Sequence, residues 1–324
     1  MKIVKFSILF VLICFPLFWV NKLQAREEAE KLQLELKFND AMNQAVDDAA
    51  RTLRTSAVWK ETEEGYESKK RLELRRDDAV ESFFMTLFLN FGLWDGVRKQ
   101  DELKRYIPVV AIIGYDGLDI YAEEEYVGRR GDAILNHVWK PTMPYGFTDQ
   151  YGNVIGFTLD DYVTIYHPSS KRWITGYQRE LKYDTAEIPL LKDDHLFDSV
   201  RRTTIVNTVQ NALASTINAH NEIALRNGVS YTFTLPAISE EEWHNTINDV
   251  GVMAFIQGLP VGYSTYNHYA LGGSRLLKRD NYRGTIINGI KYAFPERCAP
   301  TDAIESYLSA PDAAKRGYFI RSCP

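Results

Sequence analysis

The order of apolar and polar residues divides the chain into a long helical start, a strand-rich middle and a second helical region. Phe6–Val20 is a run of fifteen residues without a charge. Residues 26–58 then contain no Gly or Pro and are rich in good helix formers. Apolar residues recur there at steps of three and four, which predicts one apolar stripe on an amphipathic helix: Phe38, Met42, Ala45, Val46, Ala49 and Leu53.

The N-terminal apolar run predicts export. Lys2 and Lys5 form a short basic flank, so the N-terminus is expected in the cytoplasm and everything after Val20 across the membrane. Two interpretations stay open. A signal peptide cleaved after Ala25 would release the protein, whereas an uncleaved signal-anchor would keep it as a single-pass membrane protein. We favour the anchor, because no helix-breaking residue separates the apolar run from the amphipathic helix that follows.

A β-rich block occupies the middle of the chain. Asp116-Gly117 suits a two-residue hairpin turn between two strands, and three further strands form a meander with short antiparallel connections. Ahead of this block, Val80–Phe91 is apolar on nearly every face, which predicts a short helix buried deep in the domain. The five expected strands are Val109–Tyr115, Leu118–Tyr121, Val154–Leu159, Tyr162–Tyr166 and Arg172–Tyr177.

Helix is expected again after the meander. Asp194–Arg226 is amphipathic and ends at Asn227-Gly228. A strand at Tyr231–Leu235 precedes a helix that starts with a capping box at Ser239 and runs to about Gln257. Thr285–Ala293 reads as a further strand. The predicted fold class is therefore α+β, an antiparallel sheet with flanking helices behind an N-terminal membrane helix that continues as a long amphipathic helix.

The composition of the chain limits the classes of protein to which it can belong and the compartments in which it can fold. Hydrophobic residues make up 45% of the 324 residues, which is typical of a folded chain. The net charge is −5 and there is no long basic run, so nucleic acid is not an expected partner. Cys298 and Cys323 stand near the end of the chain with 24 residues between them. In an oxidising compartment they can pair, and the alternative is two unrelated free thiols.

The sequence contains no motif that indicates a catalytic residue, a metal site or a cofactor. We therefore do not expect the protein to be an enzyme. No two of the six histidines stand three or four residues apart, so a zinc site has no local support. Gly272-Gly273-Ser274-Arg275-Leu276 comes within one residue of a nucleophile elbow, but Leu276 replaces the second glycine and we interpret the segment as a flexible turn. The acidic residues from Asp116 to Glu125 are interpreted as a solvated face.

The tyrosines Tyr263, Tyr266 and Tyr269 are the best surface candidates. Tyrosine supplies rigid contact area with a polar tip, which suits a protein interface or a sugar platform. The same residues equally suit packing over the edge of a core. Both interpretations stay open from the sequence.

The order of parts resembles type IV pilins and the pseudopilins of related secretion and conjugation systems. An apolar N-terminal helix continues as an amphipathic helix, an antiparallel sheet follows, and two cysteines bracket the end of the chain. The resemblance implies three parts: a signal-anchor at 1–25, a stalk helix at 26–58 and an extracytoplasmic domain at 59–324. The family's processing signal, a Gly ahead of an aromatic residue or Met, is absent before Phe6, so no functional residue carries over.

This resemblance implies a membrane-anchored structural or accessory subunit of a bacterial envelope assembly. Its expected partners are the membrane and proteins of that assembly, including further copies of itself through the stripe Phe38–Leu53. The alternative is an extracytoplasmic small-molecule-binding protein with a Cache- or PAS-like domain. In such sensors a long helix also leads into a meander, and a pocket in the sheet holds the ligand.

Overall fold

The structure is a computed structural model of the 324-residue chain. It describes all residues except 1, 58–69, 72, 185–187, 227, 229–246, 263, 274–281, 288, 301–302, 304, 308–309 and 322–324, and the side chains of 2–9, 11–13, 184, 297 and 310–312 are also outside the described part. The chain forms two compact units, unit 1 (Met1–Arg275) and unit 2 (Leu276–Pro324). Each is described by itself.

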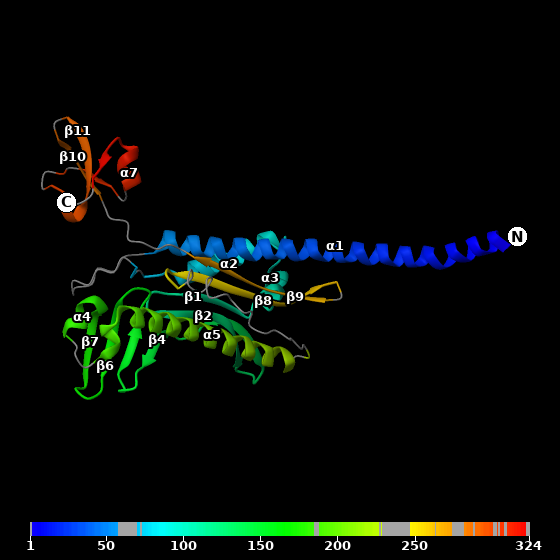
Figure 1. The fold of residues 1–324 in the computed structure, drawn as a ribbon, viewed down its shortest axis with the longest axis horizontal. Coiled ribbons are helices and arrows are strands. Elements are labelled where there is room, and N and C mark those ends of the chain that lie inside the picture. Colours follow the sequence, from blue (N-terminus) through cyan, green and yellow to red (C-terminus); the bar gives the residue numbers. More distant parts are fainter. Residues whose placement is uncertain are drawn as a thin grey trace. The chain divides into compact units, whose positions relative to one another are not determined.

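Unit 1 is α+β, with a large antiparallel sheet and helices, as predicted (Figure 1). The sheet has nine strands. Eight of them pair in the order β7-β6-β5-β4-β2-β1-β8-β9, and the ninth, β3, pairs with β2. The elements are α1 (Lys2–Ser56), α2 (Arg76–Asn90), α3 (Val97–Lys104), β1 (Val109–Ile113), β2 (Gly117–Val127), β3 (Ala133–Trp139), β4 (Met143–Thr148), β5 (Val154–Phe157), β6 (Tyr162–His167), β7 (Arg172–Tyr177), α4 (Gln178–Asp184), a 3₁₀ turn (Pro189–Lys192), α5 (Asp194–Arg226), β8 (Gly251–Val261) and β9 (Ser264–Gly273).

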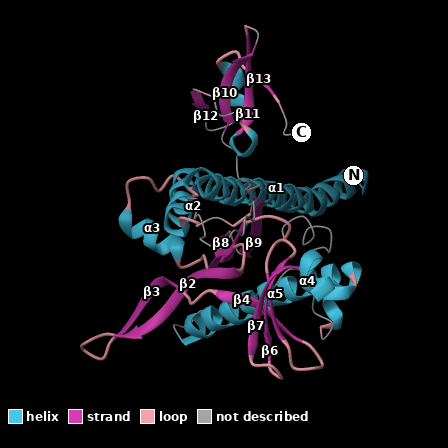
Figure 2. Ribbon diagram, turned by 90° about the vertical axis from the view of Figure 1, so that its left-hand side faces the viewer, coloured by secondary structure: helices cyan, strands magenta, loops and turns pink. Residues whose placement is uncertain are grey.

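Helices cover both faces of the central strands. Helices α1 and α2 lie on one side of β8 and β9, and α5 lies on the other side of the sheet, against β1, β2 and β4 (Figures 1 and 2). All five residues of β1 and the first eight of β8 are buried. A strand covered on both faces carries a continuous apolar run instead of an alternating one. This explains why Val109–Ile113 is apolar throughout.

The structure contradicts the predicted secondary structure of two segments. The expected helix Ser239–Gln257 overlaps β8, since Gly251–Val261 is a strand paired with both β1 and β9; residues 239–246 and the expected strand Tyr231–Leu235 lie outside the described residues. The single strand expected at Thr285–Ala293 is a hairpin that turns at Gly289, whose φ of +81° suits a glycine. The predictions for Arg172–Tyr177 and Asp194–Arg226 are confirmed at both ends.

The apolar stripe on α1 packs inside its own unit. Met42, Ala45, Val46, Ala49 and Leu53 are fully buried, and α1 contacts α2, β8 and β9 over this length. Phe38 is half-buried, and its ring stacks on Phe91 at 4.8 Å between centroids. Across the same contact, Thr86 Oγ1 donates to Asp48 Oδ2 at 2.8 Å. The stripe Phe38–Leu53 was predicted as an assembly face, but its side chains already cover the sheet of the same chain.

The N-terminal half of α1 contrasts with this packed half. From Phe15 to Leu34 every side chain on the helix is exposed. Figure 1 shows this stretch extending beyond the strands of unit 1. Among the described residues, no helix has both the length and the apolar character needed to cross a membrane.

Unit 2 is a small four-stranded sheet with one short helix. Its strands pair in the order β12-β10-β11-β13, and Ala293, Ala313 and Tyr318 form its buried centre. Cys298 is disulfide-bonded, while Cys14 is free. Cys323 lies outside the described residues, so its pairing with Cys298 stays a prediction. The elements are β10 (Tyr282–Ile287), β11 (Ile290–Pro295), a 3₁₀ turn (Glu296–Cys298), β12 (Glu305–Tyr307), α7 (Ala310–Lys315) and β13 (Phe319–Ile320).

Candidate functional site

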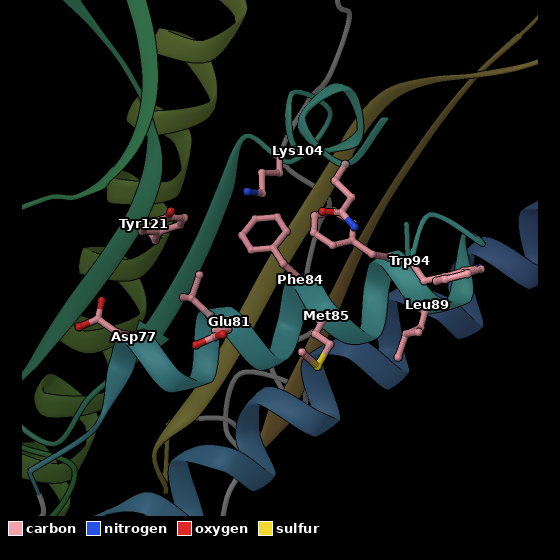
Figure 3. A pocket seen from close by; sticks show the side chains of 11 residues that line it. Asp77, Glu81, Phe84, Met85, Leu89, Trp94, Lys104 and Tyr121 are labelled. Carbon is pink, nitrogen blue, oxygen red and sulfur yellow. The ribbon is translucent and has the colours of Figure 1, made fainter. Parts of the chain in front are cut away.

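An apolar pocket of about 530 Å³ opens between α2 and α3. We call it the α2–α3 pocket. One side of α2 forms its wall, α3 and the turn before it form the opposite wall, and Tyr121 of β2 closes one end (Figure 3). It is lined by Asp77, Val80, Glu81, Phe84, Met85, Phe88, Leu89, Trp94, Gln100, Lys104 and Tyr121. Its volume lies within the range of roughly 300–1,000 Å³ that small-molecule sites occupy.

The pocket exists because α2 is buried on only one side. Phe83 and Leu87 are fully buried, whereas Met85 and Leu89 are 59% and 61% exposed. Deep burial of this helix on nearly every face, as predicted from Val80–Phe91, is therefore wrong. Trp94, which follows α2, is 71% exposed beside them. Exposed large apolar side chains gathered at one place are typical of a binding surface.

Charged groups stand at defined places around this apolar lining. Asp77 lies at one end and accepts a hydrogen bond from Trp139 Nε1 at 2.6 Å. Glu81 follows one turn later on α2. Lys104 reaches across from α3, with its Nζ 5.5 Å from the ring centre of Phe84 and 5.8 Å from that of Phe88 (Figure 3). Burial and the nearby Asp77 carboxylate raise the pKa of Tyr121, so its phenol stays protonated at neutral pH.

Behind Tyr121 lies a buried polar group, the Glu123 cluster, formed by Glu123, His137 and His220. Glu123 and His137 are directly paired across β2 and β3. Strand β1 begins opposite Ala122, so Glu123 stands just past the end of that pairing, where α5 can reach it. His220 Nδ1 of α5 lies 3.5 Å from Glu123 Oε2, and both side chains are nearly inaccessible.

The neighbours of the Glu123 cluster decide its charge state. His137 Nε2 donates to the Ile107 carbonyl at 3.3 Å, and burial lowers the pKa of His137. Burial alone would raise the pKa of Glu123. The adjoining His220 side chain, together with the electrostatic influence of His137 and Arg105, outweighs burial and lowers that pKa. The cluster therefore stabilises a carboxylate and disfavours a cation on His137.

These shifts predict that unit 1 loses stability as the pH falls. Below pH 6.5 the unfolded chain takes up a proton at residue 137 that the folded chain resists, so unfolding is favoured by up to about 1.4 kcal/mol per pH unit across that window. The carboxylate of Glu123 acts in the same direction, since its contribution is lost only as the pH drops through its lowered pKa. Denaturant unfolding between pH 7.5 and 5.5 measures the slope.

His137→Gln is the matched variant, because its amide can still donate to Ile107 while it cannot titrate. Its slope should be shallower than that of the native chain. Some slope should remain, since burial also lowers the pKa of His268. Parallel profiles for the two proteins would contradict the assignment to His137.

Tyr266 and Tyr269, two of the tyrosines predicted as a possible interface, do not line the α2–α3 pocket. Tyr266 is buried, its hydroxyl donates to Asn39 Oδ1 at 2.5 Å, and its ring packs on Phe38. Tyr269 is half-buried against Phe255. These two tyrosines therefore cover the edge of the core rather than forming an open interface, and Tyr263 lies outside the described residues.

The acidic segment after Asp116 is not one solvated face. Arg76 pairs with Asp119 at 2.9 Å, and Glu123 is buried against α5. No group of three metal-ligating side chains occurs among the described residues. Sequence reasoning missed both the α2–α3 pocket and the Glu123 cluster. Only the pairing of β2 with β3 brings Glu123 and His137 together, and no local pattern marks that pairing.

Comparisons with protein-family models, with curated proteins and with solved structures found no match. The function is therefore argued from the residues and the geometry of this chain alone.

Proposed function

We propose that this protein is a membrane-anchored, extracytoplasmic structural or accessory subunit of a bacterial envelope assembly such as a pilus, secretion or conjugation system. The observation that carries the proposal is the division of α1. Its C-terminal half is part of the core of unit 1, while its N-terminal half presents large apolar side chains that nothing in the described chain covers. A single-pass anchor with its domain outside the cytoplasm accounts for both halves.

The N-terminal half of α1 needs an apolar environment. The exposed apolar residues on it are Phe10, Phe15, Leu17, Phe18, Trp19, Val20 and Leu23. Removing one such side chain from water is worth about 1.5–3 kcal/mol, so a lipid bilayer would stabilise this stretch strongly. The charge-free run Phe6–Val20 supports insertion, with Lys2 and Lys5 on the cytoplasmic side.

Between this apolar stretch and the core lies a narrower apolar stripe. Ala25, Ala29, Leu32 and Leu36 follow one another at steps of four, three and four, and all four are exposed. Such spacing forms the seam of a coiled coil. Glu27 and Leu34, on the opposite side of α1, lie beside Val261 at the end of β8. The stripe therefore points away from the chain's own hairpin, and we assign it to association with a second copy.

Disulfide crosslinking in membranes tests the association. In a Cys14→Ser background, Leu32→Cys should give crosslinked dimers on mild oxidation. Glu27→Cys, on the hairpin side of the same helix, should give few. Equal crosslinking at both positions, or none at position 32, would contradict the assigned seam.

A second function is favoured by the α2–α3 pocket. Its volume and apolar lining support an extracytoplasmic small-molecule-binding protein. The pocket stands on helices α2 and α3, with only Tyr121 contributed by the sheet. This differs from the sheet pocket that the Cache- or PAS-like resemblance implies. Binding and anchoring are compatible in one chain.

A further inference from the structure

We infer that the α2–α3 pocket binds an organic cation whose apolar body lies on the aromatic floor. This inference rests on the small-molecule-binding function and is independent of the anchor. Three properties of the pocket carry it: the size and lining of the cavity, the excess of carboxylates over ammonium groups, and ring faces that already hold a cation.

The lining provides an apolar floor with one polar end. Phe84 lies on the floor, and Met85, Leu89 and Trp94 extend it toward the far end (Figure 3). Val80 and Phe88 also line the pocket. A ligand with an aromatic ring or a short alkyl chain would remove the exposed side chains of Met85, Leu89 and Trp94 from water. At about 530 Å³ the cavity accommodates one such molecule.

The balance of charge selects a cation. Asp77 and Glu81 place two carboxylates at one end of the pocket, against the single ammonium of Lys104. That ammonium is itself 3.8 Å from the Asp101 carboxylate. Glu81 forms no salt bridge with any residue that the structure describes, and the hydrogen bond from Trp139 holds the Asp77 carboxylate in place. A positive ligand group between Asp77 and Glu81 would balance the site.

The rings of this region already accept cations. Besides Lys104 over Phe84 and Phe88, the Arg76 guanidinium lies 4.8 Å from the ring centre of Trp139, next to Asp77. A cation over an aromatic face gains about 0.5–2 kcal/mol, depending on how far it is desolvated. The raised pKa of Tyr121, to which Asp77 contributes, agrees with a negative potential at this end.

A ligand series of constant shape tests the inference. The full-length protein would be studied by calorimetry in lipid nanodiscs, since detergent would compete for the apolar lining, and empty nanodiscs would correct for partitioning. The probes are 4-phenylbutylamine, 4-phenylbutanol and 4-phenylbutanoate. The amine should bind about tenfold more tightly than the alcohol, a difference of about 1.4 kcal/mol, and the carboxylate more weakly than either.

Two variants test whether the preference for the amine depends on the carboxylate of Glu81. Glu81→Gln should reduce the affinity for the amine to about that of the alcohol and leave the alcohol unchanged. Glu102→Gln is the control, because Glu102 is exposed on α3 and lies outside the lining. Tightest binding of the carboxylate, no binding of any probe, or an equal loss in both variants would overturn the inference. Crosslinking through Leu32→Cys would be unaffected by any of these results, so the two proposals can fail separately.

Discussion

Replacing Leu53 with glutamate is expected to unfold unit 1, with a loss of more than about 4 kcal/mol in the free energy of unfolding. Leu53 is fully buried on the last turns of α1, where that helix packs on the sheet and on α2. The substitution removes a buried leucine and places an unpaired carboxylate in its position. Circular dichroism and thermal unfolding would measure the loss.

The control is an exposed leucine on another helix. Leu225→Glu on α5 changes a leucine that is 63% exposed, and its effect on unfolding should stay within about 0.5 kcal/mol. A free stalk helix would instead tolerate Leu53→Glu and lose only its partners. A folded Leu53→Glu variant of normal stability would therefore contradict the packing of α1 on its own unit.

Gly272→Val is expected to cost about 3 kcal/mol, because it separates α1 from β9. A Cβ atom at residue 272 would lie 2.9 Å from Val46 Cγ1 and 3.1 Å from the Val46 carbonyl oxygen, both on the buried side of α1. The carbonyl oxygen cannot move without moving the helix, and the methyl group can move only by changing the rotamer of a buried valine. Denaturant unfolding of the variant would measure the loss.

The next residue offers the matched comparison. Nothing lies within 4 Å of a Cβ built at Gly273. Gly273→Val should therefore be close to neutral, and valine suits a strand. Equal destabilisation by the two variants would show that strand conformation, and not the approach of α1, sets the requirement for glycine. Gly272 thus serves helix packing, where the sequence suggested a flexible turn.

The sequence predicts best where a local pattern has a single structural solution. Asp116-Gly117 between two apolar runs indicated the β1–β2 hairpin, and the amphipathic period of Asp194–Arg226 indicated α5. Prediction from the sequence fails where a segment is buried on both sides, because its apolar residues then show no helical or strand periodicity. The apolar run Gly251–Val261 is compatible with helix and strand, and only its position between β1 and β9 decides for the strand.

A single sequence also does not show which part of the protein, or which other protein, packs against a given surface. The stripe Phe38–Leu53 shows that one face of a helix is covered, and either the same chain or a second copy can cover it. The α2–α3 pocket depends on the exposed side of α2 meeting α3. The Glu123 cluster depends on a strand register. Such contacts join residues far apart in the chain, so no spacing within a window predicts them.

The most direct test of the account is the side of the membrane on which unit 1 lies. Val127 is 82% exposed on β2, and in a Cys14→Ser background Val127→Cys gives a reactive thiol there. We expect a maleimide unable to cross the cytoplasmic membrane to label this thiol in intact cells, with the protein in the membrane fraction. Labelling only after the cells are broken open would contradict it.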